Sequence, residues 1–269
     1  MTELFKNIEM WFARNTYYDR VGPKPTVFIA GSARSGTTWI GDLIESGGSF
    51  RTLFEPFHYN RSNHGKVFVP HEYISQKGGT EAQFHALEAV FNGRVQGIWE
   101  DQSNRCLFPS ARLIKDIHSN LRLKWIKIHF PDVKFLYVIR HPISVALSRI
   151  KLGWEGPRIL DLLEQKRLIE DFPEIREASK LVGFFPNEPI LSHIFLWCVQ
   201  QKVALTQLDA TDVMVIAYEN FLADPKSETG EVYRWLGLSK KIPREKTLRK
   251  KSWTSGKQNY TREDSLKMS

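Results

Sequence analysis

One segment constrains the fold more than any other: a glycine-flanked loop that joins an apolar run to a helical pattern. Residues 26–30 form a short apolar run, which is typical of a buried parallel strand. The loop over residues 31–38 reads Gly-Ser-Ala-Arg-Ser-Gly-Thr-Thr. Apolar residues then recur at helical spacing until Gly47 and Gly48, which favour a helix end. Such a unit directs backbone N–H groups and a helix N-terminus at one point, which predicts an anion site.

The loop departs from the nucleotide-triphosphatase pattern G-x-x-x-x-G-K-[ST] at one position, because Thr37 stands where the lysine belongs. That lysine reaches the β- and γ-phosphates of a triphosphate, so its absence weakens an ATPase interpretation. Arg34, inside the loop, offers a cation in its place. A small-molecule kinase that uses ATP is therefore the alternative function.

Further apolar runs predict the rest of a sheet. Three lie at residues 113–114, 135–139 and 213–217, and residues 51–54, Arg-Thr-Leu-Phe, are interpreted as the second strand along the chain. Helical patterns lie between and after them, as with Leu196, Val199 and Val203. Alternating strands and helices predict an α/β fold of the P-loop type, with three layers and a central parallel sheet flanked by helices. We expect a single domain over residues 1–269.

Two stretches do not fit a minimal sheet. Residues 56–80 are rich in His, Asn and Gly, and residues 152–192 hold only a short helical pattern at Ile159, Leu162 and Leu163. Long connections at the carboxyl ends of strands are where α/β proteins hold substrates. We interpret both stretches as acceptor-binding insertions.

Composition excludes several classes. The chain has 269 residues, 42% of them hydrophobic, which is ordinary for a globular protein. No long apolar run or apolar N-terminal core occurs, so we expect neither a membrane span nor a secretory signal. Two cysteines cannot make a disulfide scaffold, so a reducing cytoplasm is the default location. The net charge of +8 permits nucleic-acid binding, but no recognised nucleic-acid motif supports it.

A second set of residues agrees with an anion site. The apolar run 135–139 leads directly into Arg140, and Ser148 follows eight residues later. Pro142 suits the first turn of the intervening helix. An arginine at a strand end and a serine two helical turns later could together clamp a second phosphate.

These motifs resemble those of the sulfotransferases that use 3′-phosphoadenylyl sulfate (PAPS). The signature loop R/K-S-G-T-T-W matches residues 34–39, and the second signature matches Arg140 and Ser148. A third matches Tyr-Glu-Asn-Phe at 218–221, followed by Asp-Pro at 224–225. An arginine at position 34, instead of the lysine of the aryl branch, favours the carbohydrate or protein branches. The pattern as a whole is closest to carbohydrate-type sulfotransferases, here in a soluble form.

The resemblance implies roles for individual residues in binding the donor. The 5′-phosphosulfate would be held by the loop, and the 3′-phosphate by Arg140 and Ser148. Trp39 and Tyr218 match positions that lie against the adenine. Lys250 and Lys251 echo a late basic motif that closes over the 3′-phosphate. The loop residues concerned are Arg34, Ser35, Gly36, Thr37 and Thr38.

The resemblance also suggests the catalytic groups. Glu55 is the preferred base for the acceptor hydroxyl, with His58 as a weaker alternative, and Lys115 and Arg34 would stabilise leaving-group charge. His118 competes, because the aryl branch has its base histidine in Lys-Thr-His. Here the spacing is one residue longer, and in a strand over 115–118 the side chain of His118 would face away from that of Ile117.

The resemblance implies sulfuryl transfer from PAPS to a hydroxyl acceptor, and its closest branch predicts a carbohydrate or glycolipid as that acceptor. The partner would be a small molecule or a glycan, without nucleic acid and without an integral membrane segment. A sulfuryl group carries less negative charge than a phosphoryl group, so fixed cations and backbone donors can stabilise the transition state, and no metal is expected.

Overall fold

The computed structural model describes residues 19, 21–46, 50–183 and 188–238. Within this part of the chain, five strands form one parallel sheet in the order β2-β3-β1-β4-β5. Their bounds are β1 (Thr26–Gly31), β2 (Phe50–Phe54), β3 (Ala111–Lys115), β4 (Lys134–Ile139) and β5 (Val213–Ala217). The predicted α/β fold with a central parallel sheet is confirmed, and every predicted strand is present.

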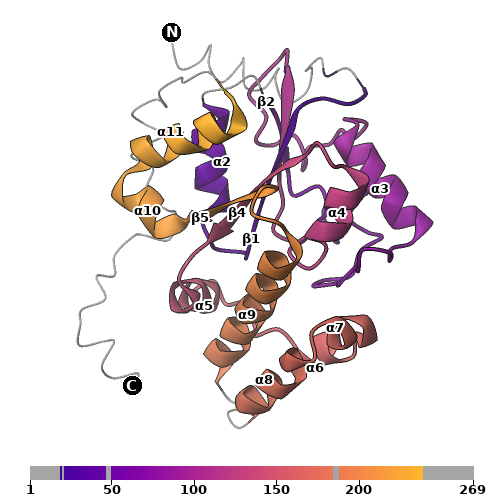
Figure 1. Ribbon diagram of the computed structural model, residues 1–269, viewed down its shortest axis with the longest axis vertical. Helices are drawn as coiled ribbons and strands as arrows, with labels where there is room; N and C mark the ends of the chain where they lie inside the picture. Colours follow the sequence, from indigo (N-terminus) through magenta and orange to yellow (C-terminus); the bar gives the residue numbers. More distant parts are fainter. Residues whose placement is uncertain (1–18, 20, 47–49, 184–187, 239–269) are drawn as a thin grey trace.

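Helices connect and cover the strands, and their labels follow Figure 1. They are α2 (Thr37–Glu45), α3 (Glu81–Phe91), α4 (Leu123–His129), α5 (Pro142–Ile150), α6 (Ile159–Leu163), α7 (Lys166–Asp171), α8 (Glu174–Gly183), α9 (Pro189–Gln207), α10 (Tyr218–Ala223) and α11 (Pro225–Leu236). Pro142 occupies the first turn of α5, as predicted. None of the described helices is long and apolar enough to cross a bilayer.

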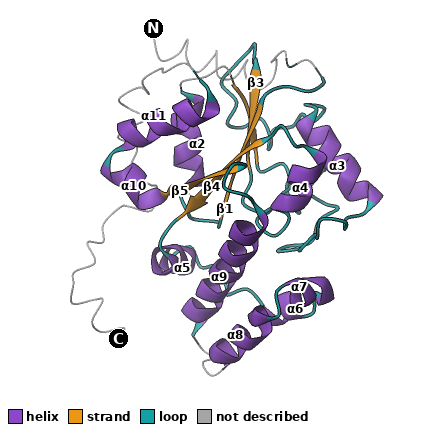
Figure 2. Cartoon of the chain, in the orientation of Figure 1, coloured by secondary structure: helices purple, strands orange, loops and turns teal. Residues whose placement is uncertain are grey.

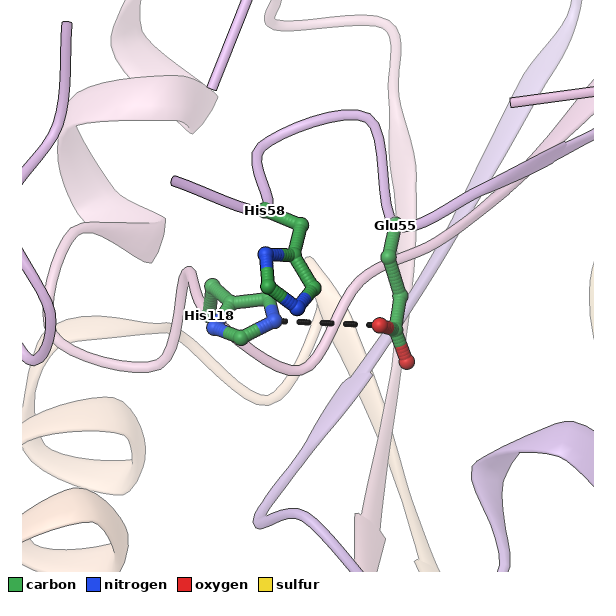
Figure 3. Close-up of side chains that lie close together, drawn as sticks. All are labelled: Glu55, His58 and His118. Carbon is green, nitrogen blue, oxygen red and sulfur yellow. Dashed lines mark ion pairs between the residues drawn. The ribbon is translucent and has the colours of Figure 1, made fainter. Parts of the chain in front are cut away.

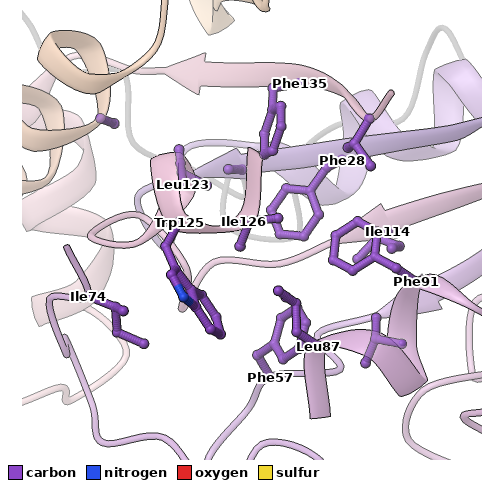
Figure 4. Close-up of a cluster of buried hydrophobic side chains, with 14 of the residues drawn as sticks. Phe28, Phe57, Ile74, Leu87, Phe91, Ile114, Leu123, Trp125, Ile126 and Phe135 are labelled. Atoms are coloured by element: carbon purple, nitrogen blue, oxygen red, sulfur yellow. The ribbon is translucent and has the colours of Figure 1, made fainter. Parts of the chain in front are cut away.

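Alternation along the strands divides the core into two layers. Phe28 and Ala30 of β1 pack into a cluster with α3 and α4, whereas Val27 and Ile29 pack into a second cluster with α2 and α11. Successive side chains of a strand point to opposite faces, so one apolar run serves both layers. Figures 1 and 2 show the helices on the two sides of the sheet, and Figure 4 shows the cluster around Phe28 and Trp125. Each fully buried aromatic or aliphatic side chain contributes about 1.5–3 kcal/mol.

The segment 152–192 is more helical than its sequence pattern indicated. The predicted helix at Ile159–Leu163 is present, but α7 and α8 were not predicted. Both helices are mostly polar, and a few apolar side chains of each pack into a third hydrophobic cluster. Leu168, Phe172 and Ile175 lie in that cluster against α9. The segment therefore forms a helical layer at the end of α9 (Figure 1).

Candidate active site

The carboxyl ends of all five strands meet at one edge of the sheet, and each brings one chemically active side chain to it. Such an edge is the usual ligand site of open α/β sheets, at the point where the strand order reverses around the first strand. These side chains border a cavity of about 880 Å³. In strand order from β1 to β5 they are Arg34, Glu55, Lys115, Arg140 and Tyr218.

The loop after β1 has the backbone shape of an anion nest. Arg34 (φ 77°) and Gly36 (φ 89°) are both left-handed and flank Ser35. Gly36 is the N-cap of α2, and a Cβ there would overlap the ring of Tyr218. The Oγ atom of Ser35 is buried and finds no hydrogen-bond partner in the part of the chain that the structure describes. Gly36, Thr37 and Thr38 line the cavity, so the N-terminus of α2 opens onto it.

Two guanidinium groups lie together beside the loop. Arg140 Nη1 donates to the carbonyl of Arg34 at 3.0 Å, and its guanidinium carbon lies 4.6 Å from the ring centroid of Tyr218. Arg34 Nε donates to Ser148 Oγ at 3.1 Å. Burial and the charge of Arg140 lower the pKa of Arg34. Holding two cations this close costs energy that a bound anion would recover.

The predicted donor residues are thus brought together, with two qualifications. Ser148 lies behind the Arg34 side chain and does not border the cavity. Lys250 and Lys251 lie outside the described residues. Trp39 borders the cavity and meets the ring of Tyr218 edge-on, with 5.8 Å between ring centroids.

Glu55 and Lys115 form a buried ion pair at the carboxyl ends of β2 and β3. The side chains contact each other through Oε1 and Nζ and are almost fully buried. Glu55 N donates to the Lys115 carbonyl at 2.7 Å, which fixes Glu55 in a left-handed conformation with φ 43°. Burial alone would raise the pKa of Glu55, but the contacts with His118 and Lys115 outweigh it and lower the pKa to about 2. Glu55 is therefore ionised throughout the physiological range.

The structure places His118, the competing candidate for the base, at the cavity. Strand β3 ends at Lys115, and the chain bends before residue 118. The His118 side chain therefore borders the same cavity as Glu55, with 3.7 Å between Nε2 and Oε2 (Figure 3). The side chain of His58 lies beside His118, with 4.5 Å between ring centroids.

Asp116 holds the two loops that carry these groups. One of its oxygens accepts from Phe57 N at 3.1 Å, and the other accepts from His118 N at 2.8 Å and from Ser119 Oγ at 2.9 Å. The residue is fully buried. The Asp116 carboxylate thus fixes where His58 and His118 lie, although sequence reasoning assigned it no role.

Sequence reasoning also missed Arg149. This buried side chain borders the cavity and supports the loop from behind, with Nη2 donating to Ser32 Oγ at 2.7 Å and to the Ala33 carbonyl at 3.2 Å. Its position next to the signature residue Ser148 was the available signal. Nothing in the spacing distinguished it from a surface arginine.

Both predicted insertions contribute to the cavity wall. These segments supply aromatic and apolar side chains to the wall, together with two histidines and one glutamate. From residues 56–80 and 152–192 come His58, Tyr59, Pro70, His71, Trp154, Glu155 and Pro157. Trp99, which was not predicted, borders the cavity and donates from Nε1 to the Glu55 carbonyl at 3.1 Å.

Comparison with solved structures finds chains of similar fold. A sulfotransferase from Alicyclobacillus acidocaldarius is 18% identical, with 86% of this chain and 87% of that chain covered and a TM-score of 0.47. Sulfotransferase STF1 from Mycobacterium tuberculosis is 12% identical, with coverage of 91% and 76% and a TM-score of 0.47. Mouse sulfotransferase SULT7A1, solved in complex with PAP, is 12% identical, with coverage of 87% and 64% and a TM-score of 0.40.

Comparison by sequence gives the family. No curated protein sequence matches the chain. The family model of the sulfotransferase domain matches residues 24–268, which is nearly the whole chain and includes every element of the cavity. This match favours sulfuryl transfer over the alternative function of an ATP-dependent kinase. The chain belongs to the sulfotransferase domain family.

Proposed function

We propose that this protein transfers a sulfuryl group from PAPS to a hydroxyl group of a carbohydrate or glycolipid. One observation carries the proposal: cations and a nest of backbone N–H groups border the same cavity as a buried carboxylate. The cations and the N–H groups suit a donor with two separate anionic groups, and the carboxylate suits an acceptor that must lose a proton.

The residues around the loop fit a phosphorylated donor. The unpartnered Oγ atom of Ser35 and the N-terminus of α2 suit the 5′-phosphosulfate. Arg140 forms no ion pair within the described part of the chain, so its charge is available for the 3′-phosphate. Ser148 would act there through its hydrogen bond to Arg34. Trp39 and Tyr218 offer aromatic surfaces for the adenine.

Bound PAPS would supply the activated sulfuryl group and the leaving phosphate. In the proposal, Glu55 accepts the proton of the acceptor hydroxyl, and His118 supports the charge on that carboxylate from 3.7 Å. Lys115, together with Arg34, stabilises negative charge on the leaving oxygen. An anion that draws Lys115 away from Glu55 would also return the pKa of Glu55 toward that of an ordinary glutamate, and so strengthen the base when the donor is present.

The aromatic part of the cavity wall suits a sugar acceptor. Tyr59, Trp99 and Trp154 offer flat apolar faces, and His71 and Glu155 lie among them as hydrogen-bonding groups. In this proposal residues 1–269 form one domain, in which segments 56–80 and 152–192 bind the acceptor. The acceptor class is tested by supplying labelled PAPS with a panel of sugars, glycolipids and non-sugar alcohols.

Donor recognition is tested first, by calorimetric titration with 3′,5′-adenosine bisphosphate, 5′-AMP and ATP with Mg²⁺. We expect the bisphosphate to bind at least tenfold more tightly than 5′-AMP. Arg140→Met should abolish that preference, because it removes the charge that faces the 3′-phosphate. Lys151→Met, at an exposed position just after α5, is the matched control. Equal affinity of the wild-type protein for the bisphosphate and 5′-AMP would refute the donor assignment.

A further inference from the structure

Three metal-ligating side chains converge at one point of the cavity. Glu55, His58 and His118, here called the Glu-His-His cluster, each place one ligand atom within 4.8 Å of the other two. They come from the loops that follow β2 and β3. Figure 3 shows both imidazole rings turned toward the Glu55 carboxylate.

This ligand set is typical of zinc sites that keep an open position. Two imidazoles and one carboxylate bind Zn²⁺ at about 2.0–2.2 Å, which in a tetrahedral arrangement places the ligand atoms about 3.4 Å apart. The separation of 3.7 Å between His118 Nε2 and Glu55 Oε2 is already close to that value. The ligand atoms all lie within 4.8 Å of one another, so no pair has to approach by more than about 1.4 Å to reach that separation.

The surroundings leave the required atoms available. Nε2 of His118 is buried, and among the described residues it has no hydrogen-bond partner. Lys115 contacts Oε1 of Glu55, so Oε2 faces the imidazoles. Asp116 holds the backbone of both loops, as outer residues do around metal sites.

Two features oppose metal binding: the charge of Lys115, which contacts the far oxygen of Glu55, and one hydrogen bond of His58. Nδ1 of His58 accepts from Asn60 N at 3.2 Å, which places the ring proton on Nε2. Coordination through Nε2 moves that proton to Nδ1 and breaks this hydrogen bond. The bond is exposed, so water replaces it, and the loss is small beside three metal–ligand bonds.

The geometry points to a binding site for a divalent transition metal of the Zn²⁺ class at the Glu-His-His cluster, and we propose that its occupancy blocks sulfuryl transfer. The bound ion takes the carboxylate electron pair that the proposed reaction needs as a base. Imidazole ligands favour Zn²⁺ over Mg²⁺, which prefers oxygen. The inhibitory part rests on the proposed function, whereas metal binding stands independently of it.

The test is calorimetric titration of the full chain with ZnCl₂ in the absence of nucleotide. We expect one site of micromolar affinity. His58→Gln and His118→Gln should each weaken binding at least tenfold, and Glu55→Gln should do the same. His129→Gln, which changes an exposed histidine on α4 outside the cavity, is the matched control. Circular dichroism checks that each variant is folded.

Titration with Co²⁺ gives an independent readout. A strong visible absorption band marks low-coordinate Co²⁺ bound through these ligands, and it should be absent in His58→Gln. Wild-type protein that binds no Zn²⁺, or that binds it equally well in both histidine variants, would overturn the site.

The inhibitory part has its own outcome. Zn²⁺ at a saturating concentration should abolish transfer of label from PAPS, and a chelator should restore it. Transfer that continues unchanged with the cluster occupied would refute inhibition. A protein that binds Zn²⁺ at the cluster but shows no transfer under any condition would count against the proposed function alone.

Discussion

At the residue scale, the central feature is Glu55. Its backbone is left-handed, and its carboxylate lies between Lys115 and His118. Two hydrogen bonds hold the backbone of Glu55 there. Glu55 N donates to the Lys115 carbonyl, and Trp99 Nε1 donates to the Glu55 carbonyl. Non-glycine residues adopt such conformations at an energetic cost, and they persist where surrounding contacts over-determine them. The backbone thus directs the Glu55 side chain into the cavity and not along the strand.

Replacement of Glu55 by glutamine tests its role as a base. The change keeps the size and removes proton acceptance, so we expect adenosine bisphosphate affinity to stay within about threefold while turnover falls at least about 100-fold. Nucleotide titration and single-turnover transfer of label measure the two quantities. Glu164→Gln, at an exposed position after α6, is the control. Turnover retained in Glu55→Gln would move the role of base to His118.

Asp116 predicts a large effect on stability. Its carboxylate accepts three hydrogen bonds in a fully buried place, and Asp116→Ala leaves those donors unsatisfied. We expect a loss of about 3 kcal/mol in the free energy of unfolding, measured with denaturant. Asp132→Ala, at an exposed loop position, should change it by less than about 0.5 kcal/mol. A similar small change in both variants would show that Asp116 does not hold the loops together.

At the element scale, the sequence predicted strands better than helices. Strands β1 and β4 are nearly continuous apolar runs because both of their faces are buried, and that pattern is local. Helices α7 and α8 carry few apolar residues, and their partners on α9 lie far along the chain, so no local pattern announces them. The same reason hid the proximity of Glu55 and His118. That proximity depends on a bend of the chain at residues 116–118, and the local sequence does not indicate a bend there.

The junction of the loop and α2 allows a test that separates strain from crowding. Gly36 has φ 89° and packs against the ring of Tyr218, whereas Gly237 has φ 71° and open space around it. We expect Gly237→Ala to cost about 1 kcal/mol in stability through the left-handed conformation alone. Gly36→Ala should cost more and abolish binding of adenosine bisphosphate, because the alanine methyl displaces Tyr218. Thermal unfolding and nucleotide titration measure both, and retained binding in Gly36→Ala would contradict a tight loop.

At the scale of the whole molecule, one buried acid should control how stability depends on pH. Burial, assisted by Asp42 and opposed by Arg105, raises the pKa of Glu45 from 4.5 to about 7. Between these values the folded chain keeps a proton that the unfolded chain has released. The contribution of Glu45 is therefore full below about pH 4.5 and is lost as pH rises through about 7.

The prediction is a difference between two stability curves. The free energy of unfolding of the wild type, relative to Glu45→Gln, should fall by roughly 3 kcal/mol between pH 4.5 and pH 7 and stay level above that. Denaturant titrations at a series of pH values measure it. A constant difference between the two proteins across this range would show that Glu45 titrates as an exposed acid.

The arrangement in which every strand of the sheet ends in a cavity residue has a practical consequence for preparing the protein. A slip of one residue in any strand moves each of its side chains to the other face of the sheet. It also moves one of the five groups out of the cavity. A compact but mispaired chain would then lose its affinity for nucleotide. Retention on an immobilised adenosine bisphosphate column therefore selects molecules by the pairing of their strands, which measurements of size or helical content do not detect.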